Sequence, residues 1–453
     1  MVFSSLTFIF FFLPLFLLLY FVLPCKNMLL LIFSLLFYAW GEPVYILLML
    51  FSSIVDFSIG KKIEESDNKK KFLYMSIFVN IAVLSFFKYS DFLIDNINML
   101  LNSNISNLNL PLPIGISFFT FQTMSYSIDI YRGRVKAQRN FLTFLTYVCM
   151  FPQLIAGPIV RYSDVDKELK ERTCSFDNLY LGMKIFLEGL FKKVLLANNI
   201  GYVYNLIINN PYNEISVSSM WLGIVCFSFQ IYFDFSGYSD MARGIGKMLG
   251  FNYPKNFNYP YMATSISDFW RRWHMTLGSW FRDYVYIPLG GNKKNIIRNL
   301  FIVWFLTGLW HGANYNFILW GLYFGILLYI EKILLKDIIS KIPIILCRIS
   351  TVFLIVVSFY IFAFDDTTSL INYGKILFFI SDNKLIDQNF YFYISNYFIL
   401  IILCSLFSTS FGSWLDEKMK DGIFKGMIYI VLFTITVAYL VGSTYNPFLY
   451  FRF

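Results

Sequence analysis

Long apolar segments alternate with short polar ones along the whole chain of 453 residues. The apolar runs occupy roughly positions 6–23, 28–40, 43–60 and 72–88, and later positions near 345–364, 390–410 and 423–442. Most of them approach the ~20 consecutive apolar residues that a helix needs to cross a bilayer. The pattern predicts an all-α, polytopic membrane protein with about 10–12 transmembrane or re-entrant helices.

Basic side chains gather in the short segments between these runs. The third run is followed by a lysine cluster made of Lys61, Lys62, Lys69, Lys70 and Lys71. Cytoplasmic loops carry an excess of Lys and Arg, so we expect this cluster, and the basic stretch 131–136, on the cytoplasmic side. Counting back three spans from the cluster then places the N-terminus outside.

Two segments are too polar or too interrupted for simple spans. The first begins at Pro111 and carries seven polar side chains between positions 117 and 129, and the second runs from Phe151 to Pro158. Irregular or polar backbone at membrane depth survives only where protein or water surrounds it. We interpret both as re-entrant or broken helices that line a cavity, with ordinary kinked spans as the alternative.

An acidic residue interrupts the apolar segment 221–235, which carries Gln230 and Asp234. A carboxylate near the membrane centre costs about 2.5–3.5 kcal/mol on insertion scales. Asp234 therefore requires a partner or water. The alternative is that Asp234 or Asp240 caps the start of a helix.

The two histidines of the chain both fall in the stretch 267–325. Taken as one helix, residues 268–283 place Asp268 four residues before Arg272, where the two can pair. One face of this helix would carry Trp270, His274, Leu277 and Phe281, and another would carry Arg271 and Arg282. An aromatic-rich basic helix suits the cytoplasmic interface. Its arginines, Arg271, Arg272 and Arg282, either bind an anionic donor or face lipid headgroups.

His311 lies inside an apolar run from about 300 to 330, which is too long for one straight helix in a bilayer about 30 Å thick. Gly308 and Gly312 beside Trp310 and His311 predict a break there. Thr307, Asn314 and Tyr315 could share the helical face of His311 and orient its ring. Ionisable residues at membrane depth are usually functional; the alternative is a structural histidine held by Asn314 or by a backbone carbonyl.

One neutral imidazole is enough to catalyse acyl transfer from a thioester to a hydroxyl. It can take the proton from a hydroxyl that attacks an acyl thioester, and the thiolate leaves without a strong general acid. We expect His311 alone to activate the acceptor. We expect His274, on the charged interfacial helix and in a different dielectric, to position the thioester. The chain has no G-x-S-x-G nucleophile elbow.

Composition narrows the function classes. Charged residues make up 14% of the chain and hydrophobic residues 57%, whereas soluble domains carry about 25% charged residues. The net charge of +9 comes from clusters between apolar runs, which argues against a nucleic-acid partner. The six cysteines show no C-x-x-C spacing and the histidines are only two, so we expect no metal site. We also expect no tightly bound cofactor.

Several segments resemble one known family, the membrane-bound O-acyltransferases, and within it the bacterial subgroup of alginate O-acetylation membrane proteins. The matching segments are PIGISFFTFQ (113–122), FPQLIAGP (151–158), QIYFDFSGYSD (230–240), FWRRWH (269–274), WFRDY (280–284), YIPLGGN (286–292), LTGLWHGAN (306–314) and NPFLYFRF (446–453). Together they extend over most of the chain.

The resemblance implies one membrane domain, 1–453, with helices around a central cavity: N-terminal spans in 1–110, a catalytic core in 111–330 and C-terminal spans in 331–453. It implies that His311 is catalytic and that His274 is the second motif histidine. Trp310, Asn314, Thr307, Asp234 and Gln230 would support the cavity. The implied donor is a cytoplasmic acyl thioester, such as acetyl-CoA.

The resemblance also implies a multi-pass protein of the bacterial plasma (inner) membrane, embedded in membrane lipid. The eventual acceptor would be an exported polysaccharide, reached through an extracytoplasmic SGNH-type acetyltransferase partner. Two alternatives stay open at this point. One is D-alanyl transfer for teichoic acid modification from a carrier protein. The other is a membrane channel or flippase without chemistry, in which both histidines would be dispensable.

Overall fold

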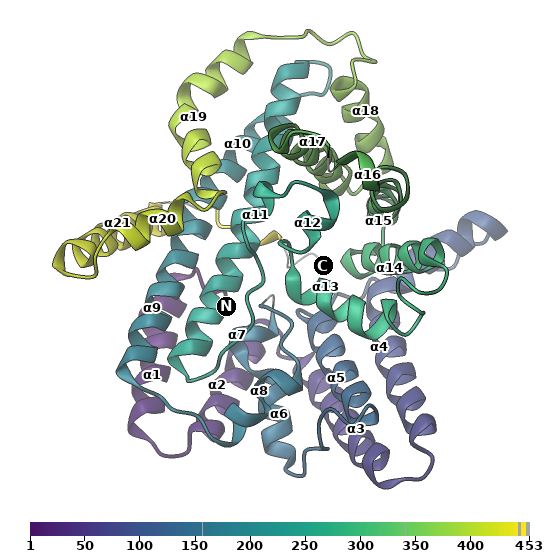
Figure 1. The fold of residues 1–453 in the computed structure, drawn as a ribbon, viewed down its shortest axis with the longest axis vertical. Helices are drawn as coiled ribbons and strands as arrows, with labels where there is room; N and C mark the ends of the chain where they lie inside the picture. Colours follow the sequence, from purple (N-terminus) through teal and green to yellow (C-terminus); the bar gives the residue numbers. More distant parts are fainter. Residues whose placement is uncertain (156, 340, 443–444, 450–453) are drawn as a thin grey trace. The chain divides into compact units, whose positions relative to one another are not determined.

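The computed structural model describes residues 1–155, 157–339, 341–442 and 445–449, and every regular element in these ranges is a helix (Figure 1). Two compact units divide the chain. The first comprises residues 1–186 and 238–255, and the second comprises residues 187–237 and 256–449. Six of the described helices are long and apolar enough to cross a bilayer, which confirms the all-α, polytopic prediction.

Helices occupy the four predicted N-terminal spans in the first unit, although only the last of them is both long and apolar enough to cross a bilayer by itself. They are α1 (Leu13–Val22, preceded by the π-helix η1, Phe8–Phe12), α2 (Lys26–Gly41), α3 (Ile46–Glu65) and α4 (Lys69–Leu101). The helix α4 has 33 residues, so its length of about 50 Å exceeds the ~30 Å of a bilayer core. It therefore continues past the predicted end of the span at position 88.

The first interrupted segment forms an unbroken helix, α5 (Ile116–Tyr131), which packs beside α3 and α4 (Figure 1). The helix is therefore not broken, and whether it is re-entrant stays a prediction. Neighbouring helices bond some of its polar side chains, whereas the buried Gln122 side chain has no partner among the described residues. Asp56 of α3 accepts hydrogen bonds from Ser76 Oγ (2.6 Å) and Asn80 Nδ2 (2.8 Å) of α4. Thr123 Oγ1 of α5 donates to Asn80 Oδ1 at 2.9 Å. The polar stripe thus joins three helices.

The second interrupted segment is broken, as predicted. Helix α6 (Phe141–Cys149) ends at Met150, and a short helix α7 (Phe151–Leu154) follows with Pro152 in its first turn. Gly115, just before α5, adopts φ +78°, and a Cβ there would lie 2.6 Å from the backbone oxygen of Leu154. Only glycine fits this close approach without strain. Residue 156 of the motif lies outside the described residues.

The remaining helices follow in chain order. They are α8 (Tyr162–Lys170), α9 (Phe176–Phe191), η2 (Lys192–Asn198), α10 (Asn199–Ile208), α11 (Val217–Met248), η3 (Pro260–Met262), α12 (Ile266–Trp270), α13 (Met275–Phe281), η4 (Arg282–Tyr286), α14 (Ile296–His311), α15 (Tyr315–Tyr329), η5 (Ile330–Leu334), α16 (Lys336–Ile339), α17 (Ile344–Ala363), α18 (Thr367–Leu377), α19 (Gln388–Phe407), α20 (Phe411–Lys418) and α21 (Ile423–Gly442). The three predicted C-terminal spans are confirmed as α17, α19 and α21.

Candidate active site

His311 is the last residue of α14, and the chain turns at Gly312 before α15 begins. This confirms the predicted break in the long apolar run. Glycines set the distance between the two helices: a Cβ at Gly308 would lie 2.3 Å from Phe317 O, and one at Gly321 would lie 2.3 Å from Trp304 O. Small residues allow such close approach of membrane helices. The close packing fixes where the His311 ring lies.

The break also separates His311 from two residues expected on its helical face. Asn314 is the N-cap of α15 and Tyr315 is its first residue, with 48% of Tyr315 exposed. The expectation of a shared face is therefore wrong for these two. Thr307 does lie one turn before His311 on α14, but its hydroxyl donates to Val303 O at 2.7 Å.

His274 lies in a turn between α12 and α13, with φ 43°. The prediction of one helix over 268–283 is wrong, and the reason is a non-local pairing of backbones. Asn258 N donates to Arg272 O, and Met275 N donates to Asn256 O, each at 2.9 Å. These bonds replace the helical ones. The turn directs His274 inward, so the face of Trp270, His274, Leu277 and Phe281 does not exist as one helical stripe.

Both histidines are buried to the same degree, with His274 1% and His311 2% exposed. Both rings are therefore equally shielded from solvent, so exposure does not support a different dielectric for the two; the position of His274 at the cytoplasmic interface stays a prediction. The two rings contact the same indole: ring centroids are 5.8 Å apart for His274 and Trp310, and 5.0 Å for Trp310 and His311. The structure thus brings together the three aromatic residues expected at the site.

Asn256 orients the His274 ring. Its Oδ1 accepts the Thr276 backbone N–H at 3.2 Å and lies 3.3 Å from His274 Nδ1. A backbone N–H can only donate, so the atom facing it is the amide oxygen, and His274 Nδ1 must carry the proton. Burial lowers the pKa of His274 to about 3. Its Nε2 is therefore a lone-pair acceptor, and within the described ranges it has no hydrogen-bond partner.

Helix α15 carries two buried donors, one of which lies beside His311. The Trp320 ring of α15 contacts the His311 ring at a centroid distance of 4.8 Å, nearly perpendicular. Asn316 lies one turn earlier on α15 and is 3% exposed. Neither Trp320 Nε1 nor the Asn316 amide has a hydrogen-bond partner among the residues that the structure describes. Buried polar groups without partners are rare in folded proteins, so these donors indicate a place where another polar group fits.

Asp234 has the partner that the sequence requires. Its Oδ1 lies 2.6 Å from Lys193 Nζ, and both side chains are at most 3% exposed. Leu449 N donates to Asp234 Oδ2 at 2.9 Å, and Gln230 Nε2 donates to Tyr445 OH at 3.2 Å. The alternative that Asp234 or Asp240 starts a helix is wrong, because both lie inside α11. These contacts hold residues 445–449 against α11; residues 450–453 of the terminal motif lie outside the described residues.

The three arginines already have carboxylate neighbours. The predicted pair is confirmed, with Arg272 Nε 3.0 Å from Asp268 Oδ2. Arg271 Nη2 lies 3.6 Å from Asp268 Oδ1, and Arg282 Nε lies 2.8 Å from Asp283 Oδ1. The side chains of Arg271 and Arg282 are 71% and 62% exposed. They are accessible to an anionic donor, which would have to compete with these carboxylates.

Sequence reasoning missed four residues of this region: Lys193, Asn256, Asn316 and Trp320. For Lys193 a signal existed, because a lysine within the apolar stretch around it also requires a partner at membrane depth. Asn316 and Trp320 are spaced four apart on the helix after His311. Asn256 gave no local signal, since its bonds reach residues 18 and 20 positions away.

The sequence profile of the membrane-bound O-acyltransferase family matches residues 131–364. A protein named probable alginate O-acetylase from Pseudomonas putida is 42% identical over 74% of this chain and 72% of its own length. The peptidoglycan O-acetyltransferase of Helicobacter pylori is 38% identical over 73% of this chain and 70% of its own length. The teichoic acid D-alanyltransferase of Bacillus subtilis is 34% identical over 48% of this chain and 58% of its own.

Proposed function

Because the chain belongs to the membrane-bound O-acyltransferase family, we propose that it moves an acetyl group from a cytoplasmic thioester donor toward hydroxyl groups of an exported polysaccharide. The protein is a multi-pass membrane acyltransferase. The proposed donor is acetyl-CoA, and the proposed location is the bacterial inner membrane. The final transfer would use an extracytoplasmic SGNH-type acetyltransferase as partner.

One observation carries the proposal: two buried histidines contact the same indole, that of Trp310. In the proposed reaction, His311 takes the proton of the acceptor hydroxyl as its oxygen attacks the thioester carbonyl carbon. The C–S bond then breaks and the thiolate leaves with its electron pair. His274, held by Asn256 and neutral, accepts a hydrogen bond at Nε2 and so orients the reacting groups.

The developing charge on the carbonyl oxygen needs donors. Asn316 Nδ2 and Trp320 Nε1 are buried donors for which the described part of the chain offers no acceptor, and Trp320 lies against His311. We assign them to this oxygen. Removing one such donor typically lowers kcat by about 10²–10³-fold. Asn316→Leu, which keeps the volume but loses the donor, should show a loss of this size.

Two glycan classes are candidates for the acceptor. Relatives named for alginate and for peptidoglycan acetylation match this chain at similar identity, so both glycan classes are candidates. The relative named for D-alanyl transfer is similar over a smaller share of the chain. An exported polysaccharide is our first choice because several relatives carry the alginate name.

The test uses the full-length protein in cells that lack the native copy. His311→Gln should abolish ester-linked acetate on the exported polymer while protein level and membrane insertion stay normal. Peptidoglycan acetate, measured in the same cells, distinguishes the two glycans. Reconstituted protein should use acetyl-CoA and not an aminoacyl carrier protein. Substantial polymer acetate with a well-expressed His311→Gln protein would remove His311 from the base role, and full activity of both His311→Gln and His274→Asn would favour the channel alternative.

A further inference from the structure

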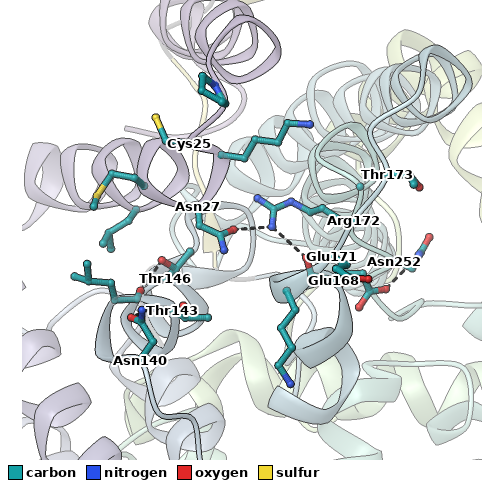
Figure 2. Close-up of a pocket in the computed structure, with 17 residues that line it drawn as sticks. Cys25, Asn27, Asn140, Thr143, Thr146, Glu168, Glu171, Arg172, Thr173 and Asn252 are labelled. Carbon is teal, nitrogen blue, oxygen red and sulfur yellow. Dashed lines mark hydrogen bonds between the residues drawn. The ribbon is translucent and has the colours of Figure 1, made fainter.

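A cavity of about 900 Å³ lies in the first unit, and the chemistry above does not use it (Figure 2). Its wall is built from residues 24–28 and 31 before and within α2, residues 140, 142, 143 and 146 at the start of α6, residues 168 and 170–173 at and after the end of α8, and residues 250 and 252. The volume lies within the ~300–1,000 Å³ of typical small-molecule sites.

Arg172 is the cation at the centre of this wall. Its guanidinium donates to three neutral oxygens: Tyr20 OH at 2.7 Å, Asn27 Oδ1 at 2.6 Å and the backbone oxygen of Glu168 at 3.1 Å. Figure 2 shows it between Asn27 and Glu168. No carboxylate lies within 4.0 Å of it in the described chain, and its Nη2 has no acceptor there.

Other arginines of the same unit are neutralised in the ordinary way. Arg134, Arg139 and Arg243 each have a carboxylate oxygen within 3.4 Å. Lys170, which also lines the cavity, lies 3.0 Å from Asp166. Arg172 is held in place by neutral groups and keeps its full charge, which is the arrangement expected of a residue that binds an anion from outside the chain.

A second cation and two carboxylates complete the wall. Lys26 is half-buried, and its nearest ring is that of Tyr20, 5.7 Å from Nζ; the described residues offer it no carboxylate within salt-bridge distance. Glu168 Oε1 accepts from Asn252 at 3.3 Å, and Glu171 is exposed. The cavity is therefore lined by two cations and two carboxylates that form no ion pair with one another among the described residues. A ligand with both charges would match them.

The cavity also has an apolar rim on the expected cytoplasmic side. Met28 and Leu142, which line it, are 43% and 46% exposed. The segment around Lys26 joins the first and second spans, so it lies on the same side as the lysine cluster at 61–71. A ligand here would lie at the boundary between headgroups and acyl chains.

We propose that this cavity binds a phosphate ester whose source is a membrane phospholipid with an amine in its headgroup. The phosphate lies against Arg172 and Lys26, the amine against Glu168 and Glu171, and the acyl chains run along Met28 and Leu142. A soluble phosphate ester shares the phosphate chemistry but leaves the apolar rim unused. The amine distinguishes the headgroup from a purely anionic one.

The experiment measures lipid that stays bound to the full-length protein. Protein purified in mild detergent is incubated with phosphatidylethanolamine, with phosphatidylglycerol, or with ADP as a soluble phosphate ester, and bound ligand is counted by native mass spectrometry. Phosphatidylethanolamine should be retained over the other two. Lys26→Gln, which breaks no hydrogen bond of the side chain, should lower retention about fivefold, the scale for one basic residue at a lipid surface.

Matched variants make the result decisive. Arg172→Gln should lose retention at least as strongly, and Lys170→Gln, in the same wall but paired with Asp166, should retain lipid as the unmodified chain does. Equal retention in Lys26→Gln and Lys170→Gln would overturn the site. Binding of ADP alone would overturn the phospholipid source, and equal retention of phosphatidylglycerol would overturn the role of the two glutamates.

Discussion

Asn256→Ala is the most informative single change, because it separates orientation of a catalytic ring from stability. The substitution removes Oδ1, which accepts the Thr276 N–H at 3.2 Å and the Thr276 hydroxyl at 2.9 Å, and faces His274 Nδ1 at 3.3 Å. Asn256 is 1% exposed. Two N–H groups therefore lose their acceptor in a buried place.

The magnitude follows from these bonds. Each buried N–H left without an acceptor costs about 1–3 kcal/mol, so the free energy of unfolding should fall by about 2–6 kcal/mol in total. The His274 ring then loses the partner that keeps the proton on Nδ1, and Nε2 is no longer fixed as the acceptor. At metal sites, loss of the partner that orients a histidine costs about 10–100-fold in affinity or activity, and we take this range as the scale for His274. We expect this loss in kcat with little change in KM for the donor.

Asn299→Ala is the matched control. Asn299 is fully buried in the same unit and donates to Gly291 O and Lys294 O at 3.0 and 2.7 Å. It lies 12 residues before His311 on α14, about 18 Å along the helix. Thermal unfolding and donor cleavage are measured for both reconstituted variants. If both lose similar stability and Asn256→Ala keeps normal kcat, Asn256 has a structural role only and the argument for the His274 tautomer fails.

Four further predictions concern packing, the buried ion pair, sidedness and proton uptake. Gly308→Ala places a Cβ 2.3 Å from a backbone oxygen of α15 and should lower both the amount of folded protein and its activity, since overpacking costs about 1–3 kcal/mol or more. Gly426→Ala, which has open space around it, should change neither. Equal behaviour of the two variants would refute the close packing of α14 against α15. Lys193→Met leaves Asp234 buried without its cation and should destabilise the folded protein by about 3–5 kcal/mol, measured by thermal unfolding in detergent. The double variant Lys193→Met with Asp234→Leu should recover much of this stability. No recovery would contradict the loss of the ion pair as the cause. Cysteines introduced at positions 271 and 282, in a background without native cysteines, should react with impermeant thiol reagents in inside-out vesicles, whereas labelling from intact cells would overturn the donor-side assignment. His274→Asn should not change the fall in rate at low pH, because a group with a pKa of about 3 is already neutral across the working pH range. Loss of this pH dependence in the variant would show that His274 is the group that takes up the proton.

The spans and the helix break could be predicted because their causes are local. Bilayer thickness sets the length of an apolar run, and positions 344–363, 388–407 and 423–442 show it directly. The break after His311 follows from glycines next to it in sequence. Asp234 required a partner because any buried carboxylate does, although the identity of that partner, Lys193, could not be predicted from the sequence.

The errors at the His274 turn and in helix α5 have one common cause, which is that distant segments supply hydrogen bonds. Residues 256–258 bond the backbone around His274 and so end α12 early. Helix α5 looked interrupted because of its polar residues, yet Asn80 of another helix accepts from Thr123. The periodicity of hydrophobic residues depends only on the residues within one segment. A turn bonded by residues 18 positions away, or polar side chains bonded by two other helices, does not change the hydrophobic periodicity of the segment itself.

Because the two histidines are equally buried, their different proposed roles need a reason other than exposure to solvent. Exposure cannot distinguish a 1% from a 2% exposed ring, so the distinction must come from hydrogen bonding. Asn256 keeps the His274 proton on Nδ1, so the neutral ring presents Nε2 as a hydrogen-bond acceptor. We assign the proton of the attacking hydroxyl to His311 because Trp320, the buried donor proposed for the developing charge, lies against its ring. Under this argument the two histidines differ in the atom that each presents to the reaction, while they occupy the same buried environment.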